Sequence, residues 1–120
     1  MPTEPATPTL SDVVRRAAEV TDPGNELVEA LLERTEDADE PVTGIEDIDE
    51  RVAEEVGRID PEGDDPVLAM TAAVAVYLGH RRDQLDSPRE DLLRLAARAE
   101  FDGAPPEDVA DWLAAEGVPA

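Results

Sequence analysis

Residues 65–82 read DPVLAMTAAVAVYLGHRR, and this stretch decides the fold of the chain. The residues from Val67 to Gly79 include no charged side chain, so a helix built from them has no polar face. Asp65 is a favourable N-cap residue, and Pro66 suits the first turn of a helix. The stretch is shorter than the roughly 20 residues that a membrane span requires. We therefore predict a helix over about residues 66–82, buried at the centre of a folded domain.

Five further segments carry helical signals on either side of this stretch. Apolar residues recur in them at steps of three and four, and caps, Gly or Pro stand at their ends. The expected helices cover about residues 10–20, 25–36, 43–59, 87–101 and 106–117. No segment alternates between apolar and polar residues in the manner of a strand. The sequence thus predicts an all-α fold, a compact bundle of about six helices around residues 66–82.

The start signals and the tail set the expected boundaries. Thr9 or Ser11 is the expected cap of the first helix. Two pairs have the spacing of a capping box, Thr43 with Glu46 and Ser87 with Glu90. Three prolines fall within residues 1–9, which predicts a disordered N-terminal tail followed by a single helical domain over residues 10–120.

The charge of the chain is extreme. It holds 31 acidic residues against ten basic ones, all arginine, for a formal net charge of −21. Residues 36–65 alone carry fourteen acids and two arginines, net −12. Like charges at this density repel in dilute buffer, whereas at molar salt the Debye length falls to roughly 3 Å. We expect weak, nonspecific cation binding by this acidic surface and no bound cofactor or metal.

The excess of Asp and Glu without any Lys resembles the cytoplasmic proteins of haloarchaea, which work in molar salt. The resemblance implies a halophilic, cytoplasmic protein. An acidic interaction module and a disordered acidic protein are the alternatives. The absence of cysteine excludes disulfides, thiolate metal sites and cysteine nucleophiles.

Two apolar features are candidate interaction surfaces. One is an amphipathic stripe in the expected third helix, and the other is Trp112. The candidate contact residues are Ile45, Ile48, Val52, Val56 and Trp112. Large apolar groups left exposed usually mark an interface, whereas the same residues turned inward belong to the core.

Three arginines in the least acidic third of the chain, Arg81, Arg82 and Arg89, are candidate anion contacts. The alternative is that they pair with nearby acids such as Asp83, Asp86 and Asp91. The only histidine, His80, stands beside them without a sequence pattern for acid–base chemistry. The sequence therefore predicts no catalytic residue and no enzyme.

Residues 92–118 resemble part of the helix-turn-helix of bacterial and archaeal regulators. Leu92–Ala97, then Gly103, then Pro106–Leu113 look like the preceding helix, a turn and the first motif helix. Gly117 and Val118 stand where the motif turn would be, and we expect no recognition helix in the major groove. The net charge argues against nucleic acid as a ligand. The prediction is a non-catalytic protein–protein interaction or accessory module, with self-association as one form. The alternative is a transcription-associated protein with a degenerate helix-turn-helix.

Overall fold

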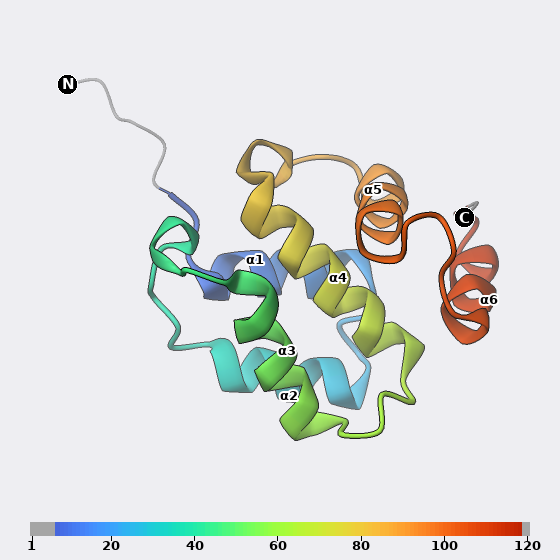
Figure 1. The fold of residues 1–120 in the computed structure, drawn as a ribbon, viewed down its shortest axis with the longest axis horizontal. Coiled ribbons are helices and arrows are strands. Elements are labelled where there is room, and N and C mark those ends of the chain that lie inside the picture. Colours follow the sequence, from blue (N-terminus) through green and yellow to red (C-terminus); the bar gives the residue numbers. More distant parts are fainter. Residues whose placement is uncertain (1–6, 119–120) are drawn as a thin grey trace.

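A computed structural model describes residues 7–118 of the chain, and within that range it contains helices and no strand. The α-helices are α1 (Leu10–Val20), α2 (Glu26–Thr35), α3 (Ile48–Ile59), α4 (Pro66–His80), α5 (Arg89–Phe101) and α6 (Glu107–Ala115). Two short 3-10 turns, η1 (Val42–Gly44) and η2 (Arg82–Gln84), lie between them. The predicted all-α bundle is confirmed (Figure 1). No helix within residues 7–118 is long and apolar enough to cross a membrane.

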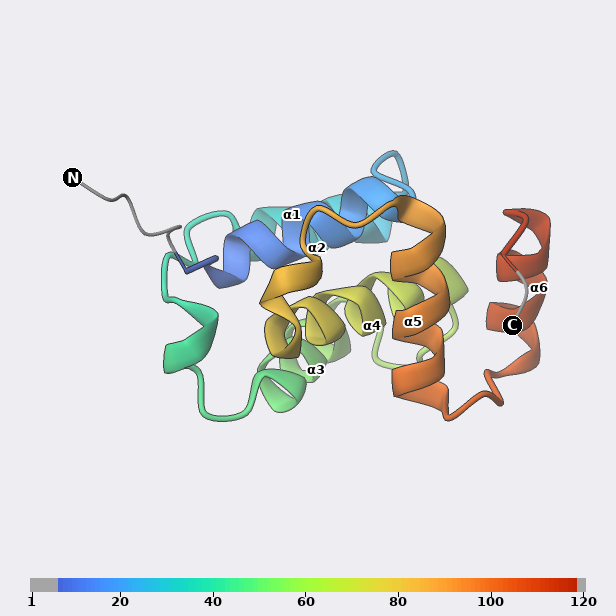
Figure 2. The same cartoon turned by 90° about the horizontal axis from the view of Figure 1, so that it is seen from above.

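Helix α4 is the centre of the molecule. It packs against each of the other five α-helices, and Figures 1 and 2 show it running through the middle while α6 lies at one end. The side chains of Leu68, Val74 and Leu78 are completely buried. The prediction of a central apolar helix is therefore confirmed.

The burial of α4 is nevertheless uneven. Ala69, Ala72, Val76 and Tyr77 recur at helical spacing and are only half-buried. These residues face the space between α3 and α5 that no other described helix covers. One stripe of an otherwise buried apolar helix thus remains open to solvent.

The start of α4 follows the local sequence signals. The Asp65 carboxylate accepts hydrogen bonds from the backbone N–H groups of Val67 and Leu68, at 2.8 and 3.2 Å, and Pro66 is the first helical residue. The helix ends at His80, two residues earlier than expected, and Arg82 lies in the η2 turn.

Both internal capping boxes predicted from spacing are wrong. Thr43 lies in η1, because the Val42 N–H donates to the Pro8 carbonyl and draws this segment toward the start of the chain. Helix α3 begins instead at Ile48, where the Asp47 side chain accepts from the Glu50 N–H.

At the second expected capping box, the Ser87 hydroxyl donates to the Gln84 side chain and leaves Pro88 as the cap of α5. Hydrogen bonds to residues outside the expected capping boxes have displaced the capping signals, to Pro8 at the first place and to Gln84 at the second.

Thr9 is the cap of α1, and it forms a complete capping box with Asp12. Thr9 also makes an isolated antiparallel bridge with Pro41, so the last residues of the expected tail are bonded to the segment that precedes α3. The remainder of that tail, residues 1–6, lies outside the described residues.

Candidate functional site

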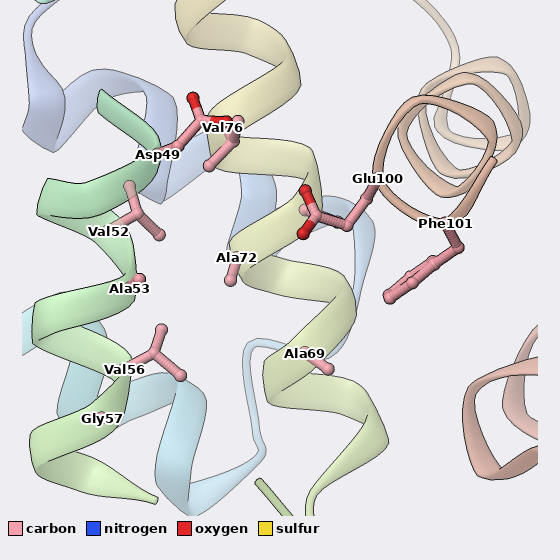
Figure 3. A pocket seen from close by; sticks show the side chains of 11 residues that line it. Asp49, Val52, Ala53, Val56, Gly57, Ala69, Ala72, Val76, Glu100 and Phe101 are labelled. Atoms are coloured by element: carbon pink, nitrogen blue, oxygen red, sulfur yellow. The ribbon is translucent and has the colours of Figure 1, made fainter. Parts of the chain in front are cut away.

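The open stripe of α4 forms the floor of a groove. Two adjoining hollows, of about 280 and 240 Å³, share Asp49, Ala73, Val76 and Glu100 in their linings. Together they make one channel between α3 and α5, which we call the α3–α5 groove (Figure 3). From Ala69 to His80 its floor runs about 16 Å along α4, at 1.5 Å per residue.

The lining of the groove is mostly small and apolar. The floor comes from α4, with Ala69, Ala72 and Val76 labelled in Figure 3. The α3 wall consists of Val52, Ala53, Val56 and Gly57, and the α5 wall contains Ala99, Glu100 and Phe101. The distance between the axes of packed helices is 8–10 Å and depends on the size of the side chains between them. Because the floor residues are small, a helix of another molecule can lie close to α4 and place large side chains in the groove.

The predicted stripe of the third helix is divided between core and groove. Ile48 and Val52 are buried, with 4% and 3% of their surfaces exposed. Ile48 packs on Gly79 of α4, while Val52 and half-buried Val56 line the groove. Ile45 precedes α3 and is half-buried against the core.

Trp112 is placed away from the groove. It lies on α6, is half-buried and packs against the core cluster. It is not among the residues that line the groove.

The floor residues of α4 and Phe101 of α5 were not among the sequence candidates. The one sequence signal for the floor is that α4 is apolar on every face. Such a helix has more apolar surface than its neighbours cover.

One end of the groove carries polar groups. The His80 Nε2 lies 2.7 Å from the Asp49 Oδ1, and Tyr77, Arg81 and Glu100 line the same hollow. The side chains of His80 and Asp49 are each 61% exposed. The pair is a solvated contact between α3 and α4.

Two of the three candidate anion contacts form ion pairs with acidic side chains. The Arg81 Nε lies 3.4 Å from the Asp83 Oδ1, and the Arg89 Nη2 lies 2.6 Å from the Glu116 Oε1. The hydrogen bond from Arg81, followed by one from Gln84, holds the pKa of the Asp83 carboxyl below its ordinary value. Arg82 is exposed on η2. Arg81 and Arg89 therefore each pair with an acid. The partner of Arg89 is Glu116 at the C-terminal end of α6, and not one of the acids near it in the sequence.

The segment that resembles a helix-turn-helix forms α5 and α6. Asp102 and Gly103 end α5 with left-handed backbone angles, φ 53° and 81°, which is a common way to terminate a helix. Val109 and Leu113 of α6 are buried, while Glu107, Asp108 and Asp111 are exposed. The exposed face of α6 is acidic.

Comparisons with known proteins add no relative to this description. No protein-family model, no curated protein and no solved structure matches the chain. Within residues 7–118, no group of three or more His, Asp or Glu side chains is placed to hold a metal ion. The α3–α5 groove, with its apolar floor and polar end, is the candidate functional site.

Proposed function

We propose that the protein is a non-catalytic interaction module that holds a helix of a protein partner in the α3–α5 groove. Its composition fits the cytoplasm of a salt-accumulating cell, where the net charge of −21 is screened. The observation that carries the proposal is the uncovered apolar stripe of the central helix α4.

The stripe supports binding because its position is unusual. Residues on the outer face of a helix in a globular protein are normally polar, yet Ala69, Ala72 and Val76 face outward and are apolar. An amphipathic helix laid in an apolar groove is a common mode of peptide recognition. The floor is long enough for about three turns of such a helix, at 5.4 Å per turn.

A binding role accounts for the lining better than catalysis does. No serine or threonine of the described chain lines the groove, and its acid–base candidates, His80 and Asp49, are largely solvated. Enzyme sites usually bury such groups. The groove offers shape and apolar surface instead of a nucleophile.

The test measures, by fluorescence anisotropy, how tightly the protein binds labelled stapled helices of about four turns. The helices carry either leucine or alanine along one face, and the salt is about 2–3 M KCl. The leucine series should bind and the alanine series should not. Ala53→Trp fills the groove from α3 and should weaken binding by about tenfold or more, the equivalent of one good apolar contact. The matched control is Ala114→Trp, at an exposed alanine of α6, which should bind like the parent. Equal binding by the two variants, or no binding by any leucine helix, contradicts the proposal.

The alternative function is a transcription-associated protein that uses residues 92–118. Its support is the α5–α6 pair, and its difficulty is the acidic face of α6. Binding to duplex DNA depends on cationic side chains that neutralise the phosphates, and its affinity falls steeply with salt. We expect no tight duplex binding at molar KCl. Submicromolar binding that is lost in the Arg81→Ala, Arg82→Ala double variant would favour this alternative.

A further inference from the structure

We infer that the partner helix carries arginine beside its apolar face, and that its guanidinium groups meet the carboxylates of Asp49 and Glu100. The inference rests on the proposed function, and it specifies the chemistry of the partner. It excludes two other occupants of the groove, a purely apolar helix and a second copy of this chain.

The two carboxylates stand where a bound helix would pass. Asp49 comes from α3 and Glu100 from α5, and both line both hollows of the groove. Figure 3 shows them approaching α4 from opposite sides, next to Val76 and Ala72. A helix lying on this floor would therefore have one acid on each flank.

Neither carboxylate is saturated by the protein itself. Asp49 uses Oδ1 toward His80, a contact in which both side chains are 61% exposed. Among the described residues, Glu100 has no hydrogen bond or ion pair through its side chain and is exposed. Along the part of the groove that Ala69 and Phe101 line, these acids are the only charged groups. The charge that complements them is positive.

Arginine fits these acids better than lysine at high salt. With a Debye length of roughly 3 Å at molar salt, charges act only in direct contact. A guanidinium binds a carboxylate through two parallel hydrogen bonds and is weakly hydrated, whereas an ammonium is a strongly hydrated point charge.

A second copy of the chain does not complement the groove. At molar salt only charges in direct contact count, and an exposed helix face of a second copy, such as that of α6 with Glu107, Asp108 and Asp111, would place further carboxylates beside these two. Like-charge contact opposes association. The partner is therefore a different protein with a basic, amphipathic helix.

The test uses the leucine-faced stapled helices with arginine, glutamine or glutamate at the positions that flank the apolar face. Binding at about 2–3 M KCl should follow the order arginine, glutamine, glutamate. Each step should change the affinity by about two- to fivefold, the usual strength of a partly exposed ion pair. In the Asp49→Asn, Glu100→Gln double variant the three helices should bind alike. Asp111→Asn, at an exposed acid of α6, is the matched control and should keep the full preference.

The outcomes separate this inference from the proposed function. If leucine helices bind the parent but not Ala53→Trp, and the flanking residues make no difference, the groove is a binding site and the inference is wrong. If the preference for arginine persists in the Asp49→Asn, Glu100→Gln variant, the acids are not its origin and the inference is also wrong. Sedimentation at the same salt that shows a dimer, abolished by Ala53→Trp, would assign the groove to a second copy. Failure of every leucine helix would overturn both proposals.

Discussion

The side chain of Ile48 on α3 lies directly against the bare backbone of Gly79 on α4. A Cβ atom added at Gly79 would overlap the Ile48 Cδ1 and would lie 3.3 Å from both of its γ carbons. Because Ile48 is buried and branched at Cβ, its χ1 angle is restricted, which holds both γ carbons beside Gly79 and leaves only rotation about χ2 to move the Cδ1 atom. The absence of a side chain at Gly79 thus fixes how closely α3 approaches α4, and with it the position of one wall of the groove.

Gly79→Ala should therefore destabilise the protein although alanine is the better helix former. We expect a loss of about 1–3 kcal/mol, the usual cost of overpacking a core, in chemical denaturation at molar salt. Adding Ile48→Val, which removes the Cδ1 atom, should restore part of this loss, so that the two changes are not additive.

The matched control for Gly79→Ala is Gly57→Ala on the exposed side of α3, where a Cβ would meet nothing within 4 Å. It should stabilise the protein by about 0.5–1 kcal/mol through helix propensity. If both alanines stabilise, the close approach of α3 to α4 is not a constraint.

Arg16 should be worth more to stability than its neighbour Arg15. Its Nε and Nη2 donate to the carbonyls of Leu85 and Ser87, at 3.1 and 2.9 Å, and so tie the segment before α5 to α1. Arg16→Ala should cost about 1.5–3 kcal/mol, the range for hydrogen bonds to a charged group.

Lysine at position 16 should recover only part of this loss, because one ammonium cannot reproduce the fork of two donors. Arg15 is 64% exposed in its side chain, and Arg15→Ala should change the free energy of unfolding by no more than about 0.5 kcal/mol. Equal losses for Arg15→Ala and Arg16→Ala would show that the two carbonyl contacts do not stabilise the fold.

A pair of buried hydroxyls should show coupling between α1 and α4. The Oγ1 atoms of Thr21 and Thr71 are 2.7 Å apart, and the Thr71 hydroxyl lies 2.8 Å from the Val67 carbonyl. The Thr21 hydroxyl likewise lies 2.9 Å from the Ala17 carbonyl, which also accepts the Thr21 N–H. Each hydroxyl has a single proton, so one of them donates to the other hydroxyl and the other donates to the carbonyl of its own helix. Every group has a partner in this arrangement.

Thr21→Val and Thr71→Val should each cost about 0.5–1.5 kcal/mol. The double variant should cost less than the sum, because it removes both polar atoms from the buried site. Full additivity in denaturant titrations would argue that the two hydroxyls do not interact.

Folding should depend on salt. The melting temperature by circular dichroism should be higher at about 2–3 M KCl than at about 0.1 M, because salt screens the repulsion within the acidic middle of the chain. A variant with four exposed acids neutralised should lose much of this dependence: Asp37→Asn, Asp39→Asn, Glu46→Gln and Glu54→Gln. Equal melting of the parent protein at both salt concentrations would contradict a halophilic origin of its composition.

The central helix could be predicted from the sequence because its signals are local and agree with one another. The apolar run after Asp65 and Pro66 requires burial whatever surrounds it. The starts of α3 and α5 could not be predicted from local spacing. The Val42 N–H donates to the Pro8 carbonyl, and the Arg16 guanidinium donates to the Ser87 carbonyl. These bonds join residues far apart in the sequence, so no local pattern predicts them.

The groove is a property of the packing and not of any one segment. The sequence shows that every face of α4 is apolar, but not which face its neighbours leave open. It likewise identifies the stripe of the third helix, but not that Ile48 packs on Gly79 of α4 while Val56 lines the groove. The acids at positions 49 and 100 are two among 31 in the sequence, and only the meeting of α3 and α5 over α4 selects them.

Trp112 gives the molecule a built-in optical reporter. It is the only tryptophan in the chain, and it lies half-buried on α6, at one end of the molecule (Figure 2). Its emission spectrum therefore reports the docking of α6 alone, whereas far-ultraviolet dichroism reports all helices together. Coincident transitions by the two signals would mean that α6 unfolds with the rest. An earlier fluorescence transition would reveal a terminal helix that detaches while the groove-bearing body remains intact.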